Sequence, residues 1–237
     1  MPVVKEWGSW AVFFSSCMAG LIAGLLRRPW ATGRDFVLVT VSAILGLALL
    51  VNSKNPLASA LRAKVKRGHV QWFLFFALSG LALLMPFLIE GIQTFPIFSL
   101  LVFSYAALLL LGREHNMFAE LNGFALLTTA APVVYFSVTG EMSWKLYLAV
   151  TVFFAAAVFK VRLIIKKTPF PRGLMVLYCA AALAVFHFLN VPVLLLLPFI
   201  ENITTSVWMK EAKLRNTGNT ELIKAVLFII LVGLFWR

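Results

Sequence analysis

Apolar residues recur along this chain in long runs instead of the narrow stripe of a soluble amphipathic helix. Each run is close to the ~20 residues that a helix needs to cross a hydrocarbon core of ~30 Å. The pattern therefore predicts an all-α, polytopic transmembrane bundle that forms a single integral membrane domain over 1–237. The nine predicted spans are 9–26, 36–52, 70–89, 95–112, 120–139, 144–165, 173–189, 191–208 and 220–236.

The seventh and eighth predicted spans are the pair that the sequence separates least. Only a short break containing Asn190 and Pro192 lies between them. Proline and asparagine favour a turn there, which gives nine spans. A single long kinked helix over this stretch is the alternative, and it would reduce the count to eight.

Composition excludes a water-soluble protein. The 237 residues are 62% hydrophobic and 13% charged, whereas soluble domains average about 45–50% apolar and about 25% charged residues. The first run is interpreted as a span and not as a cleaved signal peptide, because Glu6 precedes it and no Ala-x-Ala-like site follows it.

The net charge of +12 indicates membrane orientation and contact with anionic lipid headgroups, not nucleic-acid binding. With nine spans and the N-terminus inside, 16 of the 21 Lys and Arg residues fall on the inner side and 5 on the outer side. Positive residues concentrate in cytoplasmic segments, so this orientation is expected. With eight spans the last basic loop would lie outside, which favours nine. The expected location is a bacterial or archaeal cytoplasmic membrane, with the longest connections at 53–69 and 209–219.

Acidic residues are few, and none occurs between Met142 and Ile200. Magnesium sites depend on carboxylate oxygens, and no two carboxylates form a local metal motif. No metal and no cofactor are predicted. Two short stretches, Gly20/Gly24 and Ala19/Ala23, have the small-xxx-small spacing that lets another helix approach closely.

Glu201 is the strongest single candidate for a functional residue. It is predicted to lie near the middle of the eighth span, where an ionisable group is costly and is by default a functional hypothesis. Thr204 and Thr205 follow at helical spacing, so we expect the three to line one polar stripe, with Asn202 pointing elsewhere. The stripe is expected near Lys5 and Glu6 or near a polar group at the inner mouth of spans four and five. That group contains Arg113, Glu120 and Asn122.

Short motifs in the chain resemble those of the YwiC-like bacterial membrane proteins. Residues 5–10 read Lys-Glu-Trp-Gly-Ser-Trp and are similar to that family's Lys-Glu-His-Gly-Ala-Trp opening. Glu120-Leu121-x-Gly123, followed by a helix of small residues ending at Gly140, also fits. The family has no firmly established activity.

The layout distantly resembles the UbiA superfamily of intramembrane prenyltransferases, which implies nine spans and basic inner loops. That family's first Asn-Asp-x-x-Asp-x-x-x-Asp motif would begin here at Asn52, where Ser53, Pro56 and Ala60 replace its aspartates. The second aspartate motif corresponds to 160–172, which holds no acid. The resemblance maps the family's basic stretch onto Arg62, Lys66 and Arg67. Both metal motifs are missing, so the usual metal-dependent reaction is not expected.

Three functional hypotheses remain open. The first is a non-catalytic or atypical bundle of this layout that binds a lipid or quinone-like molecule, or that serves as a subunit of a membrane complex. The second is a metal-independent prenyl or lipid transferase that holds a phosphate through basic side chains. These are Lys160, Arg162, Lys166 and Lys167. The third is a transporter.

Overall fold

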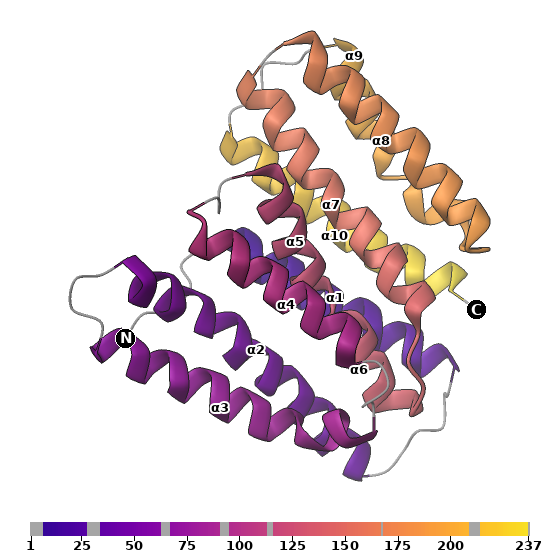
Figure 1. The fold of residues 1–237 in the computed structure, drawn as a ribbon. Coiled ribbons are helices and arrows are strands. Elements are labelled where there is room, and N and C mark those ends of the chain that lie inside the picture. The colour runs from indigo at the N-terminus through magenta and orange to yellow at the C-terminus, as the bar shows by residue number, and fades with distance from the viewer. Residues whose placement is uncertain are drawn as a thin grey trace.

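Figure 1 shows a computed structural model that describes residues 7–27, 34–62, 67–90, 95–112, 116–166, 168–208 and 214–236. Within these ranges the chain is entirely helical between its turns, with no strand. The elements are α1 (Trp7–Arg27), α2 (Arg34–Arg62), α3 (Arg67–Glu90), α4 (Phe95–Leu110), α5 (Met117–Thr128), α6 (Ala130–Thr139), α7 (Trp144–Lys166), α8 (Pro169–Phe188), the 3-10 helix η1 (Val193–Leu196), α9 (Phe199–Trp208) and α10 (Leu214–Phe235).

Helix length and hydropathy identify a polytopic membrane protein. Seven helices in the described ranges are long and apolar enough to cross a bilayer, counting α5 and α6 as one helix, and the apolar part of α4 is shorter, at Phe98–Leu110. The outer surface is itself apolar: Phe103 is 71% exposed and Leu38 is 68% exposed. Side chains of this kind are solvated by lipid tails, which confirms the predicted all-α polytopic bundle.

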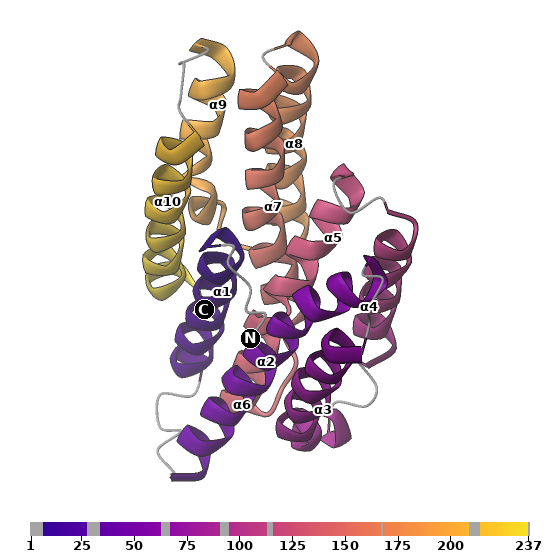
Figure 2. The same cartoon turned by 90° about the vertical axis from the view of Figure 1, so that its left-hand side faces the viewer.

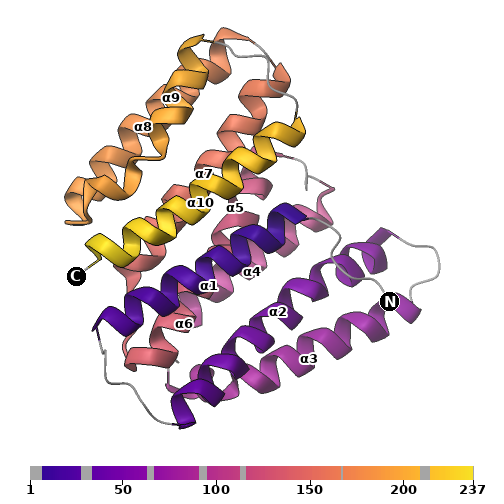
Figure 3. The ribbon, with the colours of Figure 1, turned by 180° about the vertical axis from the view of Figure 1, so that it is seen from behind.

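The helices run back and forth along one common direction (Figure 2). At one side of the bundle α2 pairs with α3, and at the other side α8 and α9 pack together. Helices α1, α5, α6 and α7 lie between these pairs. Helices α1 and α10 lie side by side and run in the same direction (Figure 3). The start of α1 and the end of α10 are therefore at opposite ends of the bundle.

The small-residue stretch of α1 packs closely against α6, as its spacing predicts. A Cβ atom at Gly20 would collide with the backbone carbonyl of Ala131, and one at Gly24 would lie 2.8 Å from Cβ of Val138. Ala19 and Ala23 are fully buried. The prediction of a close helix contact here is confirmed.

Two predicted connections are largely helical. Helix α2 continues to Arg62 and α3 begins at Arg67, so most of 53–69 is not loop. Helix α10 begins at Leu214, although the sequence predicted a connection at 209–219. The hydrophobic runs identify only the part of each helix that lies in the hydrocarbon core. A helix can continue beyond the core through polar residues, because its backbone groups stay hydrogen-bonded to one another.

The predicted eighth span is not one continuous helix. Asn190 adopts a positive φ of 50°, and η1 is followed by a turn before α9 begins. Pro192 and Pro198 flank η1 and cannot donate backbone hydrogen bonds. Because α8 and α9 pack against each other, residues 173–208 are not a single kinked helix either. The segment returns past α8 as a broken span.

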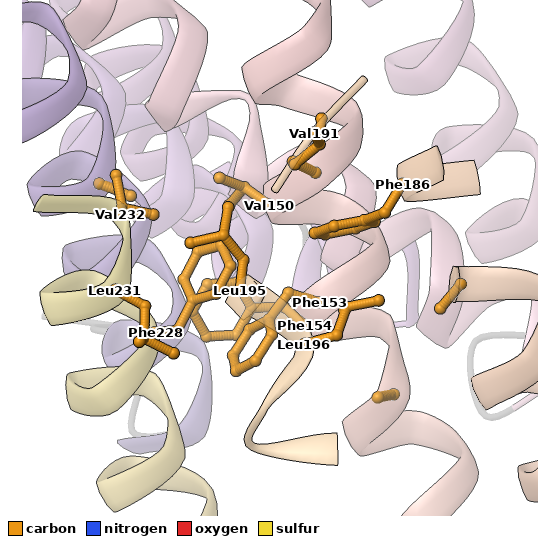
Figure 4. Close-up of a cluster of buried hydrophobic side chains, with 14 of the residues drawn as sticks. Val150, Phe153, Phe154, Phe186, Val191, Leu195, Leu196, Phe228, Leu231 and Val232 are labelled. Atoms are coloured by element: carbon orange, nitrogen blue, oxygen red, sulfur yellow. The ribbon is translucent and has the colours of Figure 1, made fainter. Parts of the chain in front are cut away.

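The largest core cluster lies where α7, α8, η1 and α10 meet (Figure 4). The rings of Phe153 and Phe228 stack with centroids 4.0 Å apart. Phe186 and Leu195 are fully buried beside them. Phe199 of α9 also belongs to this core, 5.6 Å from Phe153 between ring centroids, so the core positions α7, α9 and α10, which carry the charged residues described next.

Candidate functional site

Four charged side chains from three helices form an alternating cluster inside the C-terminal part of the bundle. We call Lys160 of α7, Glu201 of α9, and Glu221 and Lys224 of α10 the four-charge cluster. Lys160 Nζ lies 2.5 Å from Glu201 Oε2 and 2.8 Å from Glu221 Oε1. Lys224 Nζ lies 2.6 Å from Glu221 Oε1 and 3.3 Å from Glu201 Oε2. Each carboxylate thus contacts both ammonium groups, and the cluster is neutral.

The four-charge cluster sits at one depth along the bundle. Lys160 precedes the end of α7 by six residues, Glu201 precedes the end of α9 by seven, and Glu221 follows the start of α10 by seven. At 1.5 Å per residue these distances are about 9–11 Å. Glu201 lies in the first turn of α9, because that helix begins at Phe199, so the predicted continuous span over 191–208 is wrong. The two prolines that interrupt the segment shift the helix start to Phe199.

Polar groups of α9 complete the surroundings of Glu201. Thr205 Oγ1 donates a 2.9 Å hydrogen bond to Glu201 Oε1. Thr204 Oγ1 donates to the backbone carbonyl of Glu201, at 2.9 Å. Asn202 Oδ1 accepts a 2.5 Å hydrogen bond from Lys224 Nζ, while Asn202 Nδ2 is buried without an acceptor. Asn202 was predicted to point in a different direction from Glu201, yet it joins the group because the long Lys224 side chain contacts both residues.

Exposure divides the cluster into two layers. The side chains of Lys160 and Lys224 are 3% and 7% exposed, whereas those of Glu201 and Glu221 are 36% and 23% exposed. The ammonium groups form the inner layer and the carboxylates the outer one. A molecule that approaches the cluster therefore meets the glutamate side chains before the lysine ammonium groups.

Glu120 and Asn122 belong to a different part of the structure. Arg162 Nη2 lies 2.8 Å from Glu120 Oε2, and Asn122 Nδ2 donates to Ser104 Oγ at 2.6 Å. The sequence predicted that the polar stripe of Glu201 would lie near Lys5 and Glu6 or near this region, but Glu120 and Asn122 make their contacts elsewhere. Arg162 follows Lys160 by two residues, which turns it about 200° around α7, so the two ionic contacts lie on different faces of that helix.

Several predicted site residues are not described. Lys5, Glu6, Lys66, Arg113 and Lys167 lie outside the described residues. Arg62, Arg67 and Lys166 fall in helices, but their side chains are likewise outside the described part. The place of Lys5, Glu6 and Arg113 near a polar cavity stays a prediction, and so do the headgroup or phosphate contacts of the other five residues.

Lys160 does not fit the phosphate-holding role assigned to it in the transferase hypothesis. Its ammonium group already contacts two carboxylates, and the residue is 2% exposed. An incoming phosphate would have to displace those carboxylates from Lys160, and its negative charge would then lie beside two glutamates that share only Lys224. Lys160 is a partner of Glu201 instead.

Sequence reasoning missed Lys224 as a partner of Glu201, and it missed Glu221 and Asn202, which Lys224 also contacts. Glu221 and Lys224 stand three residues apart in the last predicted span, a spacing that places them on one helix face. Lys224 had been counted with the basic inner segments. The signal was therefore present: two opposite charges inside an apolar run are rare unless they are paired with each other or with a neighbouring helix.

The comparisons with known proteins add no relative: no family model, no curated protein and no solved structure matches this chain. Among the residues that the structure describes, no three His, Cys, Asp or Glu side chains gather in a group that could hold a metal ion. The four-charge cluster is thus the candidate site on its own geometry.

Proposed function

We propose that the protein is a non-catalytic or atypical UbiA-like bundle that binds a lipid or quinone-like molecule with its polar end at the four-charge cluster. The observation that carries this proposal is the partial exposure of two carboxylates about 9–11 Å below the helix ends. At that depth the head of an amphipathic molecule can meet the carboxylates while its apolar part contacts the helices. Ile200 and Leu222, the chain neighbours of Glu201 and Glu221, are 56% and 52% exposed.

The pairing of the carboxylates supports a binding role over metal-dependent chemistry. Glu201 and Glu221 already have two ammonium partners. A divalent cation would compete with both lysines at close range, and like charges repel strongly where water is scarce. We therefore expect no chelator-sensitive release of pyrophosphate from prenyl diphosphates. Release that a chelator abolishes would contradict this assignment.

Native mass spectrometry of the gently purified protein tests the binding proposal. The wild-type protein should retain a lipid or quinone-like adduct, and Glu201→Gln should retain at least fivefold less of it. Glu141→Gln is the matched control, because Glu141 is exposed in the turn before α7. Absence of any adduct on the wild-type protein, or equal loss in both variants, would contradict the proposal. Adducts of protein mass would instead favour a subunit of a membrane complex.

The proposed topology has nine crossings with the N-terminus inside a bacterial or archaeal cytoplasmic membrane. The parallel course of α1 and α10 supports an odd number of crossings (Figure 3). The positive charge bias also supports it: leaving out the buried Lys160 and Lys224 reduces the inner count from sixteen to fourteen, against five outside. A reporter fused after Arg237 should be extracytoplasmic, and a cytoplasmic signal would contradict this topology.

A transporter is a second candidate because the broken span carries Glu201. Interrupted spans often form binding sites in transporters, and ionisable groups within the membrane often carry protons. Proteoliposomes that contain a trapped pH-sensitive dye test this candidate under an imposed pH gradient. Proton flux that Glu201→Gln abolishes and Glu141→Gln preserves would favour transport over binding.

A further inference from the structure

We infer that the four-charge cluster selects a lipid whose head is a neutral hydroxyl group, in preference to an anionic phosphate or a cationic amine. This inference rests on the proposed binding function and adds the chemical class of the head. Three features of the cluster support it: its layered exposure, its charge balance, and the unpaired donor on Asn202.

The layered exposure favours a head that donates hydrogen bonds. The outer groups are the carboxylates of Glu201 and Glu221, which accept hydrogen bonds and cannot donate them when ionised. A fully ionised phosphate or a quinone carbonyl offers acceptors only, so it would face these oxygens without forming a bond. A hydroxyl group or an amine offers the required donor.

Charge balance disfavours a charged head. Two lysines and two glutamates neutralise each other within contact distance. An added anion would repel the outer carboxylates. An added ammonium group would compete with Lys160 and Lys224 for the same oxygens. Desolvating an unbalanced charge in a partly buried site is costly, whereas a neutral head leaves the balance unchanged.

The side-chain amide of Asn202 adds a further requirement: the head group should accept a hydrogen bond as well as donate one. Asn202 is fully buried, and its Oδ1 is assigned by the hydrogen bond from Lys224. Its Nδ2 is therefore a buried donor that lacks an acceptor. A buried donor left unpaired costs about 1–3 kcal/mol, so a ligand that supplies an acceptor gains affinity. Of the three heads, only a hydroxyl group both donates to a carboxylate and accepts from Nδ2 without adding charge.

A matched series of amphiphiles tests the inference on the wild-type protein. Hexadecanol, hexadecylamine and hexadecyl phosphate share one chain and differ only in the head. Titrations in detergent followed by native mass spectrometry should rank hexadecanol tightest, by at least fivefold over the other two. If none of the three binds and no lipid co-purifies, the binding function itself fails. If the amine or the phosphate binds tightest, the binding function stands and the hydroxyl assignment is wrong.

Substitution at Asn202 sharpens the test. Asn202→Asp keeps an acceptor for Lys224 but removes the Nδ2 donor and adds a negative charge. Hexadecanol should then bind about five- to tenfold more weakly and hexadecylamine more tightly, so the ratio of their affinities falls at least fivefold. Asn216→Ala, at an exposed position near the start of α10, should change neither. An unchanged ratio of the two affinities in Asn202→Asp would overturn the role of the amide, and the wild-type series decides the head group even if this variant does not fold.

Long-chain alcohols, diacylglycerols and quinols share the hydroxyl chemistry. Mass spectrometry of an organic extract of the purified protein distinguishes these sources by mass. A co-purifying molecule of any of the three kinds supports the inference. A co-purifying lipid phosphate that is absent from Glu201→Gln would contradict it.

Discussion

The two parts of the bundle are held together by different means. In α1–α6, helices approach until backbones touch: a Cβ atom at Gly80 of α3 would lie 2.8 Å from the carbonyl oxygen of Gly46 in α2. In α7–α10, large rings fill the core and the four-charge cluster joins three helices. Lipid tails are as apolar as the helices, so association requires either close packing or polar contacts.

This difference separates a packing region from a region that carries chemistry. Small residues allow contact between helices and present no polar group to a ligand. Buried charges, by contrast, are costly to place in a membrane and are rarely present without a role. The candidate site therefore belongs to α7–α10, and substitutions in the two parts should differ in size and in kind.

Removing one ammonium group from the four-charge cluster should have the largest effect. Lys224→Met leaves Glu201 and Glu221 to share Lys160, with one negative charge in excess, and it leaves the buried Asn202 Oδ1 without its donor. We expect the free energy of unfolding to fall by about 3–5 kcal/mol, measured by SDS-induced unfolding in detergent micelles. The double variant Glu221→Leu/Lys224→Met removes both charges and should recover at least half of the loss. Equal losses in the single and double variants would show that the pairing does not matter.

Adding a methyl group between α1 and α6 should have the next largest effect. Gly20→Ala forces the Ala131 carbonyl to move, because backbone atoms cannot yield as a flexible side chain does. Overpacking of this kind costs about 1–3 kcal/mol. The control is Gly173→Ala in α8, where a Cβ atom would meet nothing within 4 Å. There alanine should stabilise the helix by up to about 1 kcal/mol, and a loss similar to that of Gly20→Ala would contradict the packing argument.

The sequence predicted those features of the fold that depend on hydrophobicity and on the spacing of small residues. Apolar runs located the membrane-crossing helices, and the spacing of Gly20 and Gly24 located a close contact. The extents of α2 and α10 escaped this reasoning, because a helix continues past the hydrocarbon without any change in its own hydrogen bonding. The break before α9 depended on Pro198 as much as on Pro192, and neither residue indicates on its own how the chain turns.

Only part of the candidate site could be predicted. Glu201 was conspicuous because it is an acid after a long stretch without acids, and its link to Thr205 follows from helical spacing. Its contacts with Lys160 and Lys224 join residues 41 and 23 positions apart in the chain. Such contacts depend on which helices are neighbours, and hydropathy carries no information about that. Asn202 was excluded by its direction on the helix, which neglected the reach of a lysine from α10.

A hydrogen bond between the two parts should contribute a smaller amount. Thr128 of α5 and Thr151 of α7 have hydroxyl oxygens 2.7 Å apart. Thr128→Val preserves the shape and removes this bond, and we expect a loss of about 1 kcal/mol. The control is Thr220→Val in α10, because Thr220 is bonded to its own helix backbone and should change stability less. A loss above that of Gly20→Ala would mean that this polar contact between the two parts matters more than the close packing of α1 against α6.

The ion pair between Arg162 and Glu120, which lies outside the four-charge cluster, should contribute least to the free energy of unfolding. Arg162 Nη2 and Glu120 Oε2 lie 2.8 Å apart, a distance similar to those within the cluster. The side chains of Arg162 and Glu120 are 24% and 38% exposed, whereas both lysines of the cluster are buried. Water and headgroup ions can solvate both groups, so an unpaired charge left here is not stranded. Glu120→Gln should therefore cost about 0.5 kcal/mol or less.

The salt dependence of the unfolding free energy distinguishes the four-charge cluster from the Arg162–Glu120 pair more clearly than the size of either loss does. Dissolved ions screen exposed pairs and reach buried ones much less. In 1 M NaCl the Debye length is about 3 Å. The loss of unfolding free energy caused by Glu120→Gln should therefore shrink when the experiment is repeated at that salt concentration. The loss caused by Lys224→Met should stay the same. If both effects shrink together, ions reach the four-charge cluster. The cluster would then be a solvated network, and the argument that buried charge distinguishes α7–α10 from α1–α6 would fail.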